Sequence, residues 1–537
     1  MFTSNYVKNL LLFLAFIFFM GFLFYLGTSI VLIINQYPLS TFTVHNYISL
    51  ILNFIILIFE SITAVYGIFL FLHTALVFGK RNSLPESITL LSEPLVSLII
   101  PTFNPNLYAL ETNLLNIQHL SYTNKEIFVT DNSNDESIVS SLEELCKMYD
   151  VSFIHRDGLQ GFKARNLNNA LKQIKGEYFI IIDTDQSLKD QSIEKFLFDF
   201  QNSTDDKLAF VQGRFEIKNA NSVIRTSIAI LYTFFYDVIS LAKSSMKSVL
   251  FNGSSGCFKT KIVEEINGFP ENCYTEDIAI SNELLSQGYH SLYLNDSVTT
   301  ALVPWKLGTL LSSFWRWTHG GTSCLNIYKG KITSSRKITY FKKIELLMNT
   351  LSFVAISSIL IIIVSMLGSY WLNVQIIRPD IKLGIVVIPL FLFYPTFTSI
   401  NHLLNCLIGM WESETLFRLP YLIPYSIASI AISLFIVLPS FYALINVKGP
   451  DTPGSQWNKE FHTLRVSTVL FLGVLVFSYS MYDAFLKNKL IWLTFGSMTL
   501  VCTLTILFLL KDYRINVFEE EMKYFRNFRK MYNFKLD

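Results

Sequence analysis

Two carboxylates separated by one residue, Asp183 and Asp185, end the apolar run in the segment YFIIIDTDQSL. Residues two apart on an extended chain point to the same side, so these two carboxylates would repel each other if nothing lay between them. A divalent cation relieves that repulsion, and Mg²⁺ or Mn²⁺ is commonly held by one or two carboxylates together with substrate phosphates. The pair is therefore a candidate metal site for a phosphorylated ligand. A solvated strand end without chemistry is the alternative.

Three further segments carry groups that could act on a ligand. YTEDIAIS places Glu276 and Asp277 at the start of a helical pattern, where acids are also favourable for the helix itself. SSFWRWTHGG contains Arg316 and Trp317 and could equally be an aromatic anchor at a membrane surface. INVKGPDTPGSQW is rich in Gly and Pro and could be a plain connector. Each segment has a structural explanation, but those explanations do not account for their order along one chain.

The elements that must position these residues lie in one polar block. Short apolar runs at 95–104, 125–135, 178–188 and 208–217 are separated by helical patterns such as 161–174. Buried strands that alternate with helices predict an α/β domain with a mostly parallel sheet. Ligands bind such sheets at the carboxyl ends of the strands, and the polar residues at these ends are Thr102, Asp131, Asp183 and Asp185.

The rest of the chain is apolar enough to lie in a membrane. The chain has 537 residues, of which 51% are hydrophobic, with a mean hydropathy of +0.40, whereas its net charge of +2 indicates no partner. The segment 305–343 holds eight Lys and Arg and no Asp or Glu, so we expect it and the polar block in the cytosol. The predicted apolar segments are 10–34, 47–78, 346–367, 383–410, 421–447, 466–482 and 490–510.

We expect about six membrane spans, because the segment 421–447 is predicted to lie at the interface. Glu60 falls inside the second span, where a pore-lining or a packing role is expected. The six scattered cysteines predict no disulfide, and the acidic run 519–521 is expected to lie on a solvated helix at the membrane surface and not to form a site. The predicted regions are 1–80 (two spans), 81–304 (α/β domain), 305–343 (basic amphipathic interface helices), 344–447 (spans and an interface helix), 448–465 (loop), 466–511 (two spans) and 512–537 (cytosolic basic tail).

From about residue 95 to residue 510, these motifs resemble those of the processive family 2 glycosyltransferases, which include the cellulose, hyaluronan and chitin synthases. The segments PTFNP, GFKARNLNNAL, DTD, FNGSSG and TED occur in that family's order. The resemblance implies a cytosolic GT-A domain joined to a transmembrane pore that exports the polymer. It also implies these roles: Thr102, Asp131, Lys163, Asp183, Arg316 and Lys448 for the nucleotide donor, Asp185 with Asp183 for the metal, Gly253, Ser254 and Trp317 for the acceptor, and Asp277 beside Glu276 as general base.

Two motifs depart from the family pattern. The signature Q-x-x-R-W reads Ser313-Phe314-Trp315-Arg316-Trp317, so the Gln is lost, and the gating loop reads ALINVKG, which keeps Lys448 and Gly449. The altered signature is similar to that of capsular β-glucan synthases such as the pneumococcal serotype 37 enzyme. The resemblance thus implies a multi-pass enzyme of a bacterial plasma membrane that adds UDP-glucose to a growing β-linked polysaccharide, with no role for nucleic acid.

Other functions remain open at this stage. A hyaluronan- or chitin-type synthase would use UDP-N-acetylglucosamine instead of UDP-glucose. A non-processive glycosyltransferase would load a lipid carrier and would need no tunnel motif. A transporter with a regulatory cytosolic domain would release no UDP, and it would leave the carboxylates at the strand ends unexplained.

Overall fold

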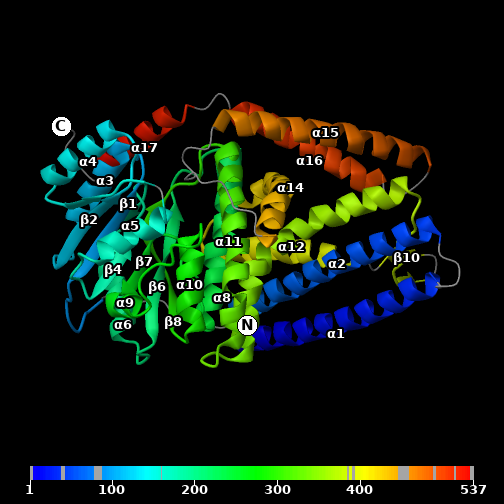
Figure 1. Cartoon of the computed structure of the whole chain (residues 1–537), viewed down its shortest axis with the longest axis horizontal. Helices are drawn as coiled ribbons and strands as arrows, with labels where there is room; N and C mark the ends of the chain where they lie inside the picture. The colour runs from blue at the N-terminus through cyan, green and yellow to red at the C-terminus, as the bar shows by residue number, and fades with distance from the viewer. Residues whose placement is uncertain are drawn as a thin grey trace.

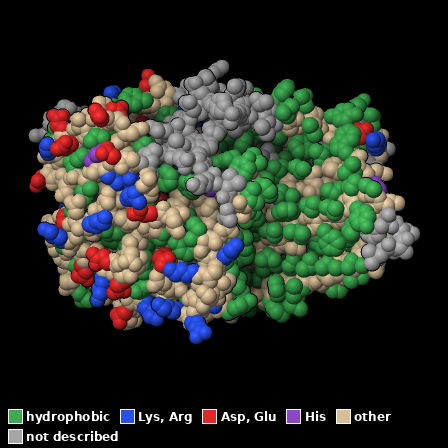
Figure 2. Space-filling model, in the orientation of Figure 1, with side chains coloured by type: hydrophobic (Ala, Val, Ile, Leu, Met, Phe, Trp, Pro, Cys, Tyr) green, Lys and Arg blue, Asp and Glu red, His purple; other side chains and the backbone are tan. Residues whose placement is uncertain are grey.

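The computed structural model describes residues 4–37, 43–77, 88–158, 160–383, 386–389, 393–445, 459–487, 492–512 and 516–531. These residues form an α/β half and a helical half, which lie side by side (Figure 1). Charged side chains gather on the surface of the α/β half, whereas the helical half presents a largely hydrophobic surface (Figure 2). This division agrees with the polar block and the apolar segments expected from the sequence.

The α/β half is built on a mixed sheet whose strand order is β3-β2-β1-β4-β7-β6-β8-β5 within the described residues. The first four strands in that order are parallel, and β6 and β8 are parallel to each other, whereas β7 and β5 run antiparallel to their neighbours. The predicted, mostly parallel α/β fold is confirmed. The strands are β1 (Val96–Thr102), β2 (Lys125–Asp131), β3 (Ser152–His155), β4 (Tyr178–Ile181), β5 (Ser187–Leu188), β6 (Leu208–Ile217), β7 (Gly256–Lys259) and β8 (His290–Ala301).

Both faces of this sheet are buried, which explains why its strands read as continuous apolar runs. Along β1, Leu98 and Ile100 pack into one hydrophobic cluster and Ile99 packs into another on the opposite face. The helices of this half are α3 (Leu107–Gln118), α4 (Glu136–Met148), α5 (Phe162–Leu171), α6 (Ser192–Gln201), α9 (Thr260–Glu265) and α10 (Glu276–Ser286).

The helical half contains long apolar helices. By length and composition, four described helices could cross a membrane, or five if the bent pair at 416–444 counts as one span. The helices of this half are α1 (Ser4–Gln36), α2 (Val44–Val77), α7 (Val223–Thr233), η2 (Phe234–Ser240), α8 (Leu241–Ser245), α11 (Leu307–Ser334), α12 (Tyr340–Trp371), α13 (Phe393–Glu412), η4 (Leu416–Tyr421), α14 (Leu422–Leu444), α15 (Lys459–Leu486) and α16 (Trp492–Asp512).

Three features of this half differ from the expectation. The apolar stretch 223–245, expected inside the α/β domain, forms the consecutive helices α7, η2 and α8, of which α7 packs against α13 and α14 and η2 against α13. The segment expected to span from residue 383 instead begins as a hairpin of β9 (Asp380–Leu383) and β10 (Val386–Pro389) before α13. Instead of short interface helices, α11 is one helix of 28 residues that contacts α10, α12 and α14.

Glu60 is buried in α2, where it packs rather than lines an opening. Its Oε2 lies 2.8 Å from Nε of Arg378 and accepts a hydrogen bond of 3.0 Å from the Tyr25 hydroxyl. Arg378 also donates to the backbone oxygen of Asn53. Of the two roles expected for Glu60, the structure favours packing, because its charge is neutralised by a buried arginine.

The C-terminal helix α17 (Val517–Met531) lies against α3 of the α/β half (Figure 1). Arg529 is 4% exposed, and it donates to Thr112 at 2.9 Å and to Glu111 at 2.5 Å. The expectation of a solvated helix away from any site is therefore wrong, because one face of α17 packs on the α/β half. The pattern of alternating charges hid this buried face.

Candidate functional site

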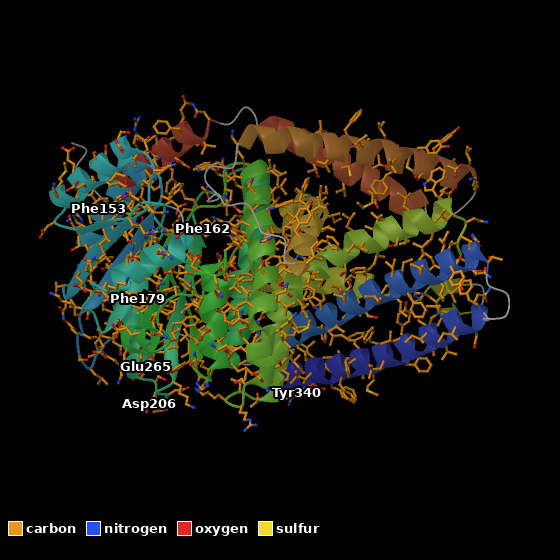
Figure 3. All side chains as sticks on the ribbon, viewed as in Figure 1. Phe153, Phe162, Phe179, Asp206, Glu265 and Tyr340 are labelled. Atoms are coloured by element: carbon orange, nitrogen blue, oxygen red, sulfur yellow. A yellow bond between two sulfur atoms is a disulfide. The ribbon has the colours of Figure 1, made fainter. Side chains whose placement is uncertain are left out.

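A cavity of about 700 Å³ opens at the carboxyl ends of the parallel strands, between the sheet and α11. It is lined by residues from the ends of β1, β4 and β8 and from α5, α10, α11 and α17. Phe162, the first residue of α5, lines it and lies on the side of the α/β half that faces the helical half (Figure 3). The sheet edge predicted to bind a ligand is thus the edge that carries the cavity.

Asp183 and Asp185 stand in the loop that follows β4, and both line the cavity. The backbone of this loop is fixed by two hydrogen bonds. The backbone amide of Asp183 donates to Ser254 Oγ at 3.0 Å, and the side-chain amide of Asn113 donates to the Asp183 carbonyl at 3.1 Å. The surrounding protein and the nearby charge of Asp183 raise the pKa of Asp185 to about 7. This carboxylate is thus held where a cation would be favourable.

Lys163, in the first turn of α5, connects three parts of the site. Its ammonium donates to Asp183 Oδ1 at 2.7 Å and to the carbonyl of Gly253 at 2.8 Å, and it lies 3.7 Å from Glu276 Oε1. Burial opposes the charge, but the carboxylates of Asp183 and Glu276 outweigh it and raise the pKa of Lys163. The lysine therefore carries a positive charge into the cavity.

Thr102 and Asp131 lie together at the ends of neighbouring strands, but only Thr102 lines the cavity. Asp131 is fully buried and accepts hydrogen bonds from the Thr102 hydroxyl at 2.7 Å, from the Ser133 hydroxyl at 2.6 Å and from the Ser133 amide at 3.0 Å. Its other contact is His155 Nδ1, at 2.8 Å. In this arrangement Asp131 supports the wall of the cavity beside Thr102, at the end where the sequence analysis expects the nucleotide. A direct contact with the base stays a prediction.

Glu276 and Asp277 form the first turn of α10, and both face the cavity. The Ile278 amide donates to Asp277 Oδ1 at 2.8 Å, which orients the carboxylate. Burial and the neighbouring charge of Glu276 raise the pKa of Asp277 to about 7. An aspartate with a pKa near neutrality can accept a proton from a bound hydroxyl group and release it again.

The segment 251–256 passes directly beside Asp277. Gly253 has a φ of +86°, and a Cβ placed there would lie 3.4 Å from Asp277 Oδ2. Ser254, which is buried, donates to Gln186 Oε1 at 2.6 Å and is not among the lining residues. The neighbouring Asn252 does line the cavity, and its side-chain nitrogen has no hydrogen-bond partner among the described residues. Of this segment, the sequence indicated Gly253 and Ser254 but not Asn252.

Helix α11 brings Arg316 and Trp317 to the opposite wall of the cavity. It comes close to the start of α10 because Gly320 has no side chain, and a Cβ there would lie 2.4 Å from Cγ2 of Thr275. The ring of Trp317 meets that of Phe314 edge to face, with 5.2 Å between the centroids. Thus the tryptophan is held by packing on one side and reaches the cavity on the other.

A disulfide joins the segment before α10 to α11, contrary to the expectation from the cysteine spacing. Cys273 and Cys324 are 51 residues apart in the sequence, with 6.5 Å between their Cα atoms. Both are buried and both lie close to the hydroxyl of Thr275. No local spacing rule could find this pair, because only the packing of α11 on α10 brings the two sulfur atoms together.

The sequence analysis missed several lining residues and named one that lies outside the described residues. Tyr274 packs against Phe162 and His319 at the cavity, and Glu521 and Phe525 reach it from α17. The spacing of residues 517, 521 and 525 is helical, and that period was the available signal. Lys448 and most of the gating-loop segment fall in residues 446–458, which the structure does not describe.

Residues 94–320 match a family model described as "Glycosyltransferase like family 2". This range contains the sheet and nearly all the lining residues discussed above. A solved mannosyltransferase from Pyrobaculum calidifontis, in complex with GDP-Man and Mn²⁺, aligns with 74% of this chain and 100% of its own at 15% identity, with a TM-score of 0.49. A likeness at that score does not bear on function.

Two similar proteins are named poly-beta-1,6-N-acetyl-D-glucosamine synthase. The one from Staphylococcus epidermidis is 26% identical over 231 residues, which are 43% of this chain and 55% of that protein. The one from Staphylococcus aureus (strain COL) is 26% identical over 270 residues, which are 50% of this chain and 64% of that protein. The chain therefore matches between 55% and 64% of the length of these relatives, and they are not named as cellulose, hyaluronan, chitin or capsular glucan synthases.

The family match and the mostly parallel sheet agree, and the carboxylates lie at the sheet edge where such domains bind their ligands. Residues 94–320 of this chain are therefore a family 2 glycosyltransferase domain of the GT-A fold.

Proposed function

We propose that this chain is a membrane-embedded, inverting glycosyltransferase that extends a β-linked polysaccharide from a UDP-sugar and passes the product through its helical half. The observation that supports this best is that Asp185, Asp277 and Trp317 line one and the same cavity. In the proposed site these residues supply a metal-binding carboxylate, a proton acceptor and an aromatic platform for a sugar, which together would serve sugar transfer. The basic segment 305–343 supports an orientation with the domain in the cytosol.

The proposed reaction uses residues at fixed positions. Asp277 accepts the proton of the acceptor hydroxyl, and the acceptor oxygen then attacks the anomeric carbon of the donor. The bond between that carbon and the diphosphate oxygen breaks, UDP leaves, and the configuration inverts. Arg316 and Lys163 carry positive charge at the cavity and offset the negative charge of the departing diphosphate. Trp317 supports the acceptor ring.

The donor set fits a divalent cation. Asp185 has no ion-pair partner among the described residues, and no group of three His, Cys, Asp or Glu side chains is found there that could hold a metal alone. Two carboxylates completed by substrate phosphates are the usual arrangement for Mg²⁺. We propose that Asp183 and Asp185 hold Mg²⁺ or Mn²⁺ together with the donor. The cation would neutralise charge on the diphosphate.

Purified protein incubated with Mg²⁺ or Mn²⁺ and single UDP-sugars tests the proposal through UDP release and product length. We expect UDP release that stops with EDTA, together with a product of many sugar units. UDP release with only single sugars transferred to lipid would favour a non-processive enzyme. The absence of UDP release from every UDP-sugar would contradict the proposed activity.

The same assay identifies the donor. The two relatives named above are N-acetylglucosamine polymer synthases, so we place UDP-N-acetylglucosamine first. UDP-glucose, the donor expected from the sequence, comes second. Competition between the two donors at equal concentration measures the preference directly, and a product that contains only glucose would reverse this order.

Asp185→Ala tests the metal proposal separately. We expect UDP to bind the parent more tightly with Mg²⁺ than with EDTA, and this difference to disappear in the variant. Asp206→Asn is a matched control, because the Asp206 side chain is exposed on the α/β half and is not among the lining residues of the cavity (Figure 3). If calorimetry shows the same dependence on Mg²⁺ in Asp185→Ala and in the parent, the assignment of the metal site is wrong.

A further inference from the structure

The C-terminal helix α17 forms part of the wall of the donor cavity, although it follows the last long apolar helix. Val517, Glu521 and Phe525 line the cavity at spacings of four residues, so they share one face of the helix. Phe525 and Phe528 are 3% and 5% exposed. This face of α17 therefore packs on the protein and borders the cavity, whereas Glu519 on the same helix is exposed to solvent.

Contacts on both sides hold α17 across the cavity. On one side, Arg529 donates to Thr112 and Glu111 and its guanidinium lies 3.8 Å from the ring centroid of Tyr108, all on α3. On the other side, Glu520 lies 3.8 Å from Arg225 of α7. A helix attached to both halves at once has its cavity-facing residues fixed in position.

Glu521 is placed at the end of β1. Its Oε2 accepts a hydrogen bond of 3.1 Å from the side chain of Asn106, the residue that caps α3 directly after this strand. Glu521 and Asp185 both line the cavity. Glu521 and Thr102 thus lie at the same end of the cavity, the end assigned above to the nucleotide.

The chemistry of a carboxylate decides which part of the donor it can contact. An ionised Glu accepts hydrogen bonds and repels phosphates, so the diphosphate would avoid Glu521. A ribose hydroxyl, in contrast, donates a hydrogen bond to a carboxylate and is neutral. We propose that Glu521 binds a ribose hydroxyl of the nucleotide donor and that α17 is therefore a structural part of the donor site. This inference rests on the proposed function.

Calorimetry with UDP, 2′-deoxy-UDP and 3′-deoxy-UDP in the presence of Mg²⁺ tests it on the full chain. In the parent, removal of the contacted hydroxyl should weaken binding about tenfold or more, which is the typical value of a hydrogen bond to a charged group. In Glu521→Gln, UDP binding should weaken to a similar degree, and the difference between UDP and that deoxy analogue should largely vanish. Glu519→Gln, with the same change on the exposed face of α17, should behave like the parent.

The possible outcomes separate this inference from the proposed function. If the parent binds UDP and Glu521→Gln binds UDP with the same affinity, the inference is wrong while the proposed function stands. Equal discrimination against both deoxy analogues in Glu521→Gln and the parent overturns it as well. If the parent binds no UDP, both fail. Glu521→Asp keeps the charge and should retain part of the difference in affinity between UDP and the deoxy analogue. That result would show that α17 is still packed on the α/β half in the variant.

Discussion

Two acids of the cavity in the α/β half, Asp185 and Asp277, differ from Glu60 of the helical half in how the fold compensates their charge. Glu60 forms an ion pair with Arg378 and accepts a hydrogen bond from Tyr25, and Arg378 in turn donates to the backbone oxygen of Asn53. Asp185 and Asp277, in contrast, have no ion-pair partner among the described residues, and burial raises the pKa of both to about 7. An acid whose charge the fold does not compensate lowers the stability of the protein. Such acids occur at functional sites, where a bound ligand or a proton compensates the charge.

The comparison teaches how to separate structural from functional acids in one chain. Glu60 is an acid inside an apolar helix, a position that often indicates function. Its arginine partner comes from a distant segment, 318 residues along the chain, so its structural role was not visible in the sequence. Asp277 begins a helix, a position that often indicates capping, and here it faces a cavity instead.

The largest expected effect is that of Asp277→Asn. The variant keeps the shape of the side chain but cannot accept a proton, so transfer should fall by about 10²- to 10⁴-fold while UDP binding stays unchanged. UDP release and calorimetry measure the two quantities, with Asp206→Asn as the control. Polymer formation near the parent rate would exclude Asp277 as the base and would remove the contrast with Glu60.

The second expected effect is on stability and concerns the helical half. Glu60→Gln leaves Arg378 buried without its counter-charge, which typically costs about 3–5 kcal/mol. Thermal unfolding in detergent should show a destabilised protein with parent UDP affinity in the fraction that stays folded. The double variant Glu60→Leu/Arg378→Met removes both charges and should recover much of the stability. Loss of UDP affinity in folded Glu60→Gln would mean that this acid also serves the donor site.

The third prediction concerns pH. Because Asp277 must be ionised to accept a proton and its pKa is raised to about 7, kcat should fall about tenfold for each pH unit below that value. The charges that face it are Glu276, which raises this pKa, and Lys163 and Arg316, which lower it. Glu276→Gln should therefore shift the fall to lower pH. A pH profile that is flat between 5 and 8 (about the range in which such groups titrate) would contradict the role of burial.

The smallest expected effect is that of Trp317→Ala, at the boundary between the two halves. Loss of stacking on a sugar ring costs on the order of 1 kcal/mol, or about a fivefold loss of polymer extension, while UDP binding should remain. Trp411→Ala is the control, because Trp411 is 65% exposed on α13, away from the cavity-lining residues. If Trp317→Ala fails to fold, an anchoring role is favoured, and Trp317→Phe then decides between anchor and platform through its rate of extension.

The parts of the site that the sequence predicted lie at the ends of single elements. The strand expected at 208–217 is β6 with those bounds, and β1, β2 and β4 each lie within or match their expected runs. Buried parallel strands read as short apolar runs, and the residues after them must lie at one edge. Asp183 and Asp185 could therefore be placed from local pattern alone. The sequence analysis missed β3, the outermost strand beside β2, because its residues are only partly buried and form no apolar run.

What the sequence by itself determined was the α/β class, the apolar helical half and the sheet edge with its carboxylates, because these depend on apolar runs and helical periods within single elements. The tertiary structure decided the partners. Asn106 meets Glu521 across 415 residues, Cys273 meets Cys324, and Glu60 meets Arg378. Such pairs carry no period and no fixed spacing. They form only when the buried faces of separate elements pack, and that packing depends on the whole chain at once.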